Sequence, residues 1–404
     1  MSTGTRTKTP AGERRSLTTL VALLLAAVLG LLVVTPSALA DRGAPRIIGG
    51  VTAPADSWPS QAALLDSLRV NPGLAQFCGG TLIDPNWVLT AAHCVTTDSG
   101  AYLTPADVQV AVGIQTLSSI TPSDRIGVAE VVVHPEWRTA GLRWDAALLR
   151  LATPSSQPTM QMIQPSELSA SAGGRPAEMA GWGCTATEDE SCVIGGFPDS
   201  LQELRTNFVS DSECASLLNS KALGIENFDP DAMICAGSVT VGDRRACIGD
   251  SGGPVVASVG GRRVLAGLTS FGSARPLCTL PNFPSVFTRV ASVRGWVDGK
   301  LGRRANLTAV SLKPAKKKVK AGKKVSLRVT VTNVGNAATT ATVRLSVSNR
   351  KKAKVPGSVR VPVDAGGSAT GAVTVTTKRG KGGKVTVKAI LGSRVAKSAI
   401  TLSR

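Results

Sequence analysis

One serine and two histidines are the residues with the clearest capacity for chemistry. Ser251 stands in the segment Gly249-Asp250-Ser251-Gly252-Gly253, a pattern that places a serine on a tight, accessible turn. A hydroxyl becomes a useful nucleophile when a base removes its proton, and an imidazole has a suitable pKa near neutral pH. The chain contains only two histidines, His93 and His134, and both precede Ser251. A base for Ser251 must therefore come from earlier in the chain.

The order of these residues separates the known arrangements of a catalytic serine. α/β-Hydrolases place their histidine after the serine, and no histidine follows Ser251. His93 comes soon after the apolar run Trp87-Val88-Leu89-Thr90, and Asp145 opens another, Asp145-Ala146-Ala147-Leu148-Leu149, so an expected strand lies beside each. The order His93, Asp145, Ser251 is that of the chymotrypsin group, whereas subtilisins have Asp, His, Ser.

Three segments together resemble the signature segments of trypsin-like proteases. They are Thr90-Ala91-Ala92-His93-Cys94, Trp144-Asp145-Ala146-Ala147-Leu148-Leu149 and Gly249-Asp250-Ser251-Gly252-Gly253-Pro254, and the likeness runs from about Ile47 to Leu301. The resemblance implies an all-β fold with two six-stranded antiparallel β-barrels of the chymotrypsin type. It also implies a serine endopeptidase that acts on proteins or peptides. His134 lies in a stretch, Val131 to Pro135, that resembles a non-catalytic part of the family, and we expect it to be structural.

The resemblance gives each site residue a role. His93 takes the proton from Ser251 and later gives it to the leaving amine, while Asp145 holds the imidazole in the right tautomer. The backbone N–H groups of Gly249 and Ser251 are expected to form the oxyanion hole. No cofactor or metal is expected, because the sequence has neither a C-x-x-C pair nor additional histidines.

The N-terminus has the features of an export signal. Arg14 and Arg15 precede an apolar stretch from Leu17 to Val34, and the small-residue pattern Ala38-Leu39-Ala40 follows. We expect a signal peptide over residues 1–40 and a secreted product. A retained membrane anchor is the alternative, since the stretch approaches a spanning length. The sequence leaves the export route open between the general and the twin-arginine pathway.

A second processing site follows directly. Arg46-Ile47-Ile48-Gly49-Gly50 resembles the activation junction of the family, and the propeptide, residues 41–46, is short. Cleavage after Arg46 by an activating protease would free the amine of Ile47. By resemblance, this amine pairs with Asp250, because a buried carboxylate needs a charged partner.

The eight cysteines predict four disulfides, because an even set in an extracellular chain is most simply read as paired. The resemblance implies Cys78–Cys94, Cys214–Cys235 and, at the specificity pocket, Cys247–Cys278. A local bridge between Cys184 and Cys192 is then the economical assignment for the remaining two.

The specificity pocket departs from the family pattern. Trypsin-like members carry an acid six residues before the nucleophile, which selects Arg or Lys at P1, and this chain has Arg245 there. The pocket walls are expected at Ser270-Phe271-Gly272 and at Ser285, where the family usually has glycine. A buried arginine would favour an acidic or polar P1 residue and would prevent ready self-cleavage after Arg46. The alternatives are that Arg245 faces solvent, or that Asp243 takes the role of the acid.

Charge divides the chain sharply. Residues 305–404 hold 22 Lys/Arg and one acid, a net charge of +21, whereas residues 41–304 hold 20 Lys/Arg and 25 Asp/Glu, a net charge of −5. We therefore place a protease domain at residues 47–302 and a basic domain at residues 303–404.

The basic domain has the alternation of half-buried strands. Val325, Leu327, Val329 and Val331 alternate with polar residues, which predicts a small β-sandwich. The segment from Lys323 to Asn336 resembles the bacterial cell-adhesion-related (CARDB-type) sandwich domains.

The positive charge of this domain indicates an anionic partner. It would hold the secreted enzyme on an anionic cell-wall polymer or surface, with a solubilising spacer as the alternative. No specific nucleic acid is expected, because no aromatic residue follows Trp296. The competing function for the whole chain is a catalytically silent protease homologue that acts in adhesion.

Overall fold

The computed structural model describes residues 1, 4, 47–97, 99–185, 197–218, 228–240, 244–272, 278, 282–380 and 382–404. The expected signal peptide lies almost wholly outside these residues, as do Arg46, Cys192 and Asp243. Within the described residues, no helix is both long and apolar enough to cross a membrane.

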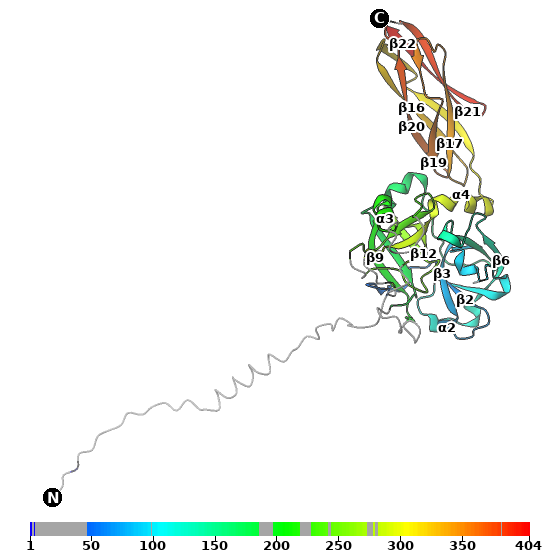
Figure 1. The fold of residues 1–404 in the computed structure, drawn as a ribbon, viewed down its shortest axis with the longest axis vertical. Helices are drawn as coiled ribbons and strands as arrows, with labels where there is room; N and C mark the ends of the chain where they lie inside the picture. The colour runs from blue at the N-terminus through cyan, green and yellow to red at the C-terminus, as the bar shows by residue number, and fades with distance from the viewer. Residues whose placement is uncertain are drawn as a thin grey trace. The chain divides into compact units, whose positions relative to one another are not determined.

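Six antiparallel strands close into a first barrel in the order β2-β3-β4-β7-β6-β5. Figure 1 labels β2, β3 and β6 of this barrel. Their bounds are β2 Gln61–Asp66, β3 Gln76–Asp84, β4 Trp87–Thr90, β5 Val108–Val112, β6 Ile126–Val133 and β7 Ala147–Leu151. Fully buried Leu64, Leu82, Val88 and Leu149 fill the interior. Short connections include α2 (Pro72–Ala75) and the 3-10 turns η1 (His93–Val95), η2 (Pro105–Asp107), η3 (Leu117–Ser119), η4 (Pro122–Asp124) and η5 (Ala140–Leu142).

A second barrel closes in the order β8-β9-β10-β13-β12-β11, with β11 pairing back to β8. Its strands are β8 Pro176–Gly181, β9 Gln202–Val209, β10 Met233–Ala236, β11 Pro254–Val259, β12 Arg262–Phe271 and β13 Ser285–Arg289. The short strand β1 (Val51–Thr52) adds to β9, and η6 (Pro165–Ser171), α3 (Asp211–Leu218) and α4 (Val290–Lys300) complete the region. The two six-stranded antiparallel barrels expected from the sequence are confirmed.

Three disulfides join the cysteines as the family resemblance implies. The paired Cα atoms are 6.1 Å apart in Cys78–Cys94, 6.2 Å in Cys214–Cys235 and 5.5 Å in Cys247–Cys278. Cys184 is also disulfide-bonded, and its predicted partner Cys192 lies outside the described residues. In the chain-entropy account, closing loops of this length stabilises the fold by about 3 kcal/mol per bridge.

The C-terminal region is a sandwich of two sheets. The four-stranded sheet has the order β14-β16-β20-β18, and the five-stranded sheet has the order β15-β22-β21-β17-β19. The first contains β14 Leu307–Lys313, β16 Lys324–Asn333, β18 Ala353–Lys354 and β20 Ser368–Thr377. The second contains β15 Lys316–Lys320, β17 Thr339–Val347, β19 Ser358–Val363, β21 Gly383–Leu391 and β22 Arg394–Ser403.

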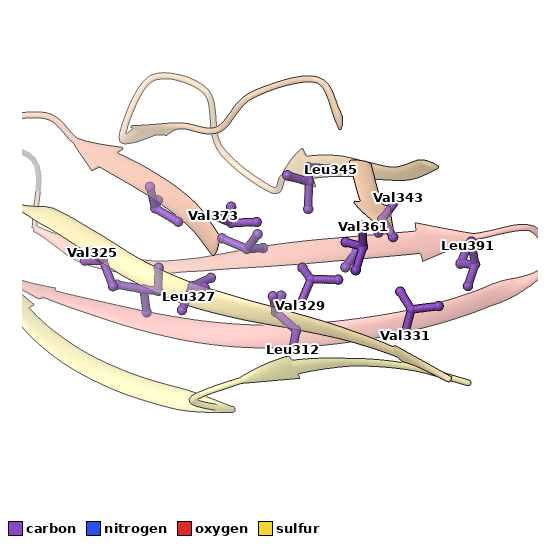
Figure 2. Packing of buried hydrophobic residues seen from close by; sticks show 14 of the residues in the cluster. Leu312, Val325, Leu327, Val329, Val331, Val343, Leu345, Val361, Val373 and Leu391 are labelled. Carbon is purple, nitrogen blue, oxygen red and sulfur yellow. The ribbon is translucent and has the colours of Figure 1, made fainter. Parts of the chain in front are cut away.

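Alternation along the strands builds the sandwich core. Side chains on a strand point to opposite faces in turn, so Val325, Leu327, Val329 and Val331 of β16 all enter the space between the sheets (Figure 2). The expected β-sandwich is therefore present. Many families share this architecture, so the likeness to CARDB-type domains stays a prediction.

Candidate active site

Strand pairing brings His93 and Asp145 together. β4 pairs with β7, with Thr90 opposite Ala147, so the segment after β4 and the residue before β7 meet at the same end of the barrel. The ring nitrogen Nδ1 of His93 lies 2.7 Å from Oδ2 of Asp145, and the backbone N–H of His93 donates to Oδ1 at 2.9 Å. The carboxylate thus fixes both the backbone and the ring of the histidine.

Asp145 is completely buried and accepts a further hydrogen bond that the sequence did not indicate. The hydroxyl of Ser270, on β12 of the second barrel, donates to Oδ2 at 2.6 Å. Thr288 on β13 donates to the backbone carbonyl of Asp145 at 2.7 Å. These contacts hold the carboxylate from the second barrel, so the orientation of His93 depends on both barrels.

The environment of His93 favours its protonated form. Burial alone would lower the pKa of His93, but the charge of Asp145 and its hydrogen bond together raise that pKa above the ordinary value. An imidazole with a raised pKa is a stronger base near neutral pH. Its imidazolium form is stabilised by the buried partner.

The turn that carries Ser251 is docked against the first barrel. Gly252 has φ +76°, and a Cβ there would lie 2.2 Å from Oγ1 of Thr90, so glycine is required by both conformation and space. The backbone N–H of Gly79 on β3 donates to the carbonyl of Ser251 at 2.7 Å. The second barrel's serine is thereby held beside the strand that leads to His93.

The peptide between Gly249 and Asp250 is fixed at both of its polar atoms. The Gln76 side-chain amide donates to the carbonyl of Gly249 at 3.0 Å, and the N–H of Asp250 donates to the carbonyl of Cys247 at 3.0 Å. Across the described residues, the N–H groups of Gly249 and Ser251 donate no hydrogen bond. Both N–H groups are thus without a partner among these residues, and their role as oxyanion donors stays a prediction.

Comparison with known proteins decides the family. The trypsin family model matches residues 47–297, which include both barrels. The chain belongs to the trypsin family. Chymotrypsin-like elastase family member 1 of Homo sapiens is 35% identical over 261 residues, or 63% of this chain and 91% of that protein. The Rattus norvegicus protein of the same name is 35% identical over 260 residues, or 63% of this chain and 88% of that protein.

A second kind of relative is a larger protein. Serine proteinase stubble of Drosophila melanogaster is 33% identical over 261 residues, which are 63% of this chain but 31% of that protein. At the level that the family supports, this chain is a serine protease whose substrates are proteins or peptides.

Asp250 of this trypsin-family chain is a buried acid with two backbone donors. Oδ1 accepts from the N–H of Gly183 and Oδ2 from the N–H of Cys247, each at 2.8 Å. Burial raises the pKa of Asp250 to about 7, against the lowering effect of these two hydrogen bonds. Among the described residues, Asp250 has no basic side chain as a partner. The site is suited to receive a cation.

Ile47 is buried, at 1% exposure, and the following residue is already paired within the protease domain. Ile48 forms an isolated bridge with Arg245, whose backbone N–H donates to the Ile48 carbonyl at 3.2 Å. Ile47 and Ile48, the first two residues after the predicted activation cleavage, are thus buried within the protease domain.

The raised pKa of Asp250 predicts a pH-dependent stability for the uncleaved chain. A neutral buried carboxyl stabilises the folded state fully below the unfolded pKa of about 4, and this contribution disappears as the pH rises through about 7. Between these values the free energy of unfolding should fall by up to about 4 kcal/mol. Thermal and urea unfolding of the uncleaved Ser251→Ala protein at pH 5 and 8 measures it, with Asp250→Asn as the reference that lacks the titration.

Cleavage after Arg46 should abolish this dependence. The new ammonium of Ile47 would hold Asp250 ionised, so the cleaved protein should show no such loss between pH 5 and 8. An Asp250→Asn chain that retains the full pH dependence of the uncleaved protein would contradict the assignment to this group.

A cavity of about 180 Å³ lies beside Ser251. Its described lining residues are Ala246, Cys247, Ile248, Ser251, Thr269, Ser270, Phe271, Gly272 and Cys278. Ser270 and Gly272, two of the predicted pocket residues, therefore do line it. Arg245 and Ser285 are not among these lining residues and are each 1% exposed. The Ser285 hydroxyl accepts from the N–H of Ala246, one of the lining residues, at 3.1 Å.

The second histidine is packed as an aromatic side chain. His134 stacks on Trp144, with ring centroids 5.3 Å apart, and contacts the edge of Trp296 at 4.9 Å. Burial lowers its pKa, so the neutral ring predominates. This environment agrees with the structural role expected for His134. Cys78, His93 and Cys94 bring ligand-type atoms close together, but both cysteines are in a disulfide and offer no thiolate to a metal.

Proposed function

We propose that this chain is an active, secreted serine endopeptidase that cleaves peptide bonds through a Ser251–His93–Asp145 triad. The observation that carries the proposal is the hydrogen-bonded His93–Asp145 pair, together with a serine turn docked against the same barrel. The free N–H groups of Gly249 and Ser251 support it further. The competing proposal of a silent adhesion protein would be favoured by a missing triad member, and all three residues are present.

The chemistry follows from this arrangement. Oγ of Ser251 attacks the scissile carbonyl carbon while its proton passes to Nε2 of His93, and Asp145 stabilises the imidazolium. The carbonyl oxygen becomes an oxyanion that the N–H groups of Gly249 and Ser251 accommodate. When the C–N bond breaks, His93 gives the proton to the leaving amine and an acyl-enzyme remains. Water, deprotonated by His93, then releases the acid and restores Ser251.

Activation is proposed to follow cleavage after Arg46. The support is the buried Asp250, which lacks a basic side-chain partner in the described structure, and the already buried Ile47. An ammonium at Ile47 would neutralise the carboxylate beside the oxyanion donors. The protein would then be an inactive precursor until another protease cuts it.

The proposed P1 preference is for acidic or polar residues. Arg245 is buried next to Ala246 and Cys247, which line the cavity, so its side chain does not face bulk solvent. A guanidinium behind the wall would disfavour a basic P1 side chain. The alternative is a small apolar P1 residue, because Ala246, Ile248 and Phe271 supply apolar wall, and relatives carry the name elastase.

Retention at the cell surface is proposed for the basic domain. Its net charge of +21 would attract an anionic cell-wall polymer, whereas the protease domain is net acidic. Salt would then release the secreted protein from cells. A spacer without a partner would not be held in this way.

A peptide library varied at P1 tests the enzymatic proposal. The protein should begin at Ile47, and Ser251→Ala is the control. Cleavage after Asp or Glu that the control lacks would support the role of Arg245 and exclude self-activation at Arg46. Cleavage after Lys or Arg would mean that Arg245 does not determine the P1 preference. Absence of any Ser251-dependent cleavage would favour the adhesion function.

A further inference from the structure

The two outer faces of the C-terminal sandwich differ in chemistry. Alternation along the five-stranded sheet turns Lys316, Lys318, Lys320, Lys384, Lys388 and Lys397 outward, on strands β15, β21 and β22. Arg344 and Arg360 add to the same face from β17 and β19. None of these five strands contains Asp or Glu. We call these eight cations the lysine face.

The four-stranded sheet presents a different surface. It turns four cations outward, Lys313, Lys324, Arg328 and Lys354, and the rest of this face is mainly Ser and Thr. Some of these hydroxyls already bond to one another, Thr330 to Thr370 at 2.9 Å and Thr332 to Ser368 at 2.8 Å. The hydroxyls of this face therefore partly hydrogen-bond to one another, whereas the like charges of the lysine face cannot compensate one another.

Strand register places the lysine charges close together. Lys388 lies directly opposite Lys397, and Lys318 and Lys384 flank Thr401 on the strand between them. Neighbouring strands are about 5 Å apart, so these cations repel one another across roughly 5 to 10 Å. Within the described part of the sandwich, no residue of the lysine face forms a salt bridge. The compensating negative charge must come from outside the domain.

The side-chain types indicate which anion fits. Six of the eight cations are lysines, compact point charges that bind phosphate oxygens without the fixed fork geometry of arginine, which suits a flexible chain of separate phosphates. Thr401, Thr386 and Ser346 stand between the lysines at outward positions and can donate hydrogen bonds to phosphate oxygens. The absence of aromatic residues after Trp296 removes the stacking that bases would use.

We propose that the lysine face binds a linear phosphodiester polymer that lacks bases, such as a polyol phosphate chain of a cell wall. The proposal rests on the surface retention proposed above and specifies the face and the chemistry that provide it. A flexible chain crossing strands β15, β22 and β21 would place successive phosphates beside successive lysines. Binding would be electrostatic, through release of counterions from both partners.

The test measures binding of poly(glycerol phosphate) to the whole protein beginning at Ile47, across a range of salt concentrations. The triple variant Lys318→Gln, Lys388→Gln, Lys397→Gln is compared with a matched variant of the other face, Lys313→Gln, Lys324→Gln, Lys354→Gln. Both lose the same charge. The lysine-face variant should bind at least tenfold more weakly, and its log–log salt slope should fall by roughly 2, at about 0.7 per lost contact. The matched variant should change less than threefold.

Several results would overturn the proposal. An equal loss of affinity in both variants would mean that net charge alone is responsible for binding. If the unaltered protein does not bind poly(glycerol phosphate) at low salt, this class of polymer is excluded as the partner. Equal affinity for polyglutamate or for single-stranded DNA would contradict the phosphodiester chemistry or the exclusion of bases. A Lys→Arg triple at the same three positions should keep most of the affinity, which separates charge from misfolding. Peptide cleavage by all these variants is measured separately, so a failed endopeptidase function is distinguishable from a failed binding face.

Discussion

Replacing Asp145 with asparagine is expected to lower kcat about 10⁴-fold, the size of effect that follows when the base is held in the wrong tautomer. The carboxylate of Asp145 accepts from Nδ1–H and N–H of His93 and from the hydroxyl of Ser270. An amide can offer only one oxygen to these donors, and its NH₂ group would turn the imidazole proton toward Ser251. Steady-state kinetics on the best peptide of the P1 library measures the loss.

The pH profile separates this effect from general damage. Asp145 raises the pKa of His93 against the lowering effect of burial, so Asp145→Asn should move the acid limb of kcat/KM to lower pH. Ser270→Ala, which leaves the carboxylate in place, should cost only about tenfold. Asp231→Asn, at an exposed acid, is the matched control and should be silent. An unchanged acid limb in Asp145→Asn would contradict the coupling.

Asp250→Asn is expected to lower kcat/KM of the cleaved enzyme by roughly 10² to 10³-fold. Without its carboxylate partner the ammonium of Ile47 would be a buried uncompensated charge, at a cost of about 3–5 kcal/mol. In the asparagine, the side-chain NH₂ group would face one of the two backbone donors, the N–H of Gly183 or of Cys247, and could not accept its hydrogen bond. The oxyanion donors on either side of residue 250 would then lose their fixed position.

Two measurements accompany this variant. Active-site titration shows what fraction of the protein reaches the active form, and kinetics of that fraction report its intrinsic rate. Asp231→Asn again serves as a surface control. A fully active Asp250→Asn enzyme would show that activation does not depend on an ion pair at this position.

The sequence was most informative where the signal is local. The segments around His93, Asp145 and Ser251 could be read directly, because a catalytic turn needs particular residues at adjacent positions. The alternation of apolar and polar residues from Val325 to Val331 was an equally clear signal, because one face of a half-buried strand must be apolar. What could not be predicted is contact between distant positions: Ser270 meets Asp145 across 125 residues, and no local pattern encodes that hydrogen bond.

The pocket shows the same limit. The spacing from Ser251 identifies Arg245 as a candidate pocket residue. Whether its side chain reaches the cavity depends on the packing around it, which the sequence does not show. Ser285, predicted from the sequence as a wall residue, is not among the described lining residues, and its hydroxyl accepts from the N–H of Ala246, which does line the cavity. Likewise the basic composition of residues 303–404 was evident, but the pairing of its lysine-bearing strands in one sheet depends on strand order, which alternation does not reveal.

The sandwich core of Val, Leu, Ile and Ala has an optical consequence. All six tryptophans and the one tyrosine of the chain lie at or before Trp296, so the sandwich is almost invisible to ultraviolet absorbance and intrinsic fluorescence. A fluorescence-detected melt will therefore report the barrels alone, and the β-sheet signal of far-ultraviolet circular dichroism will contain both parts. The difference between the two curves isolates the unfolding of the basic domain without any label.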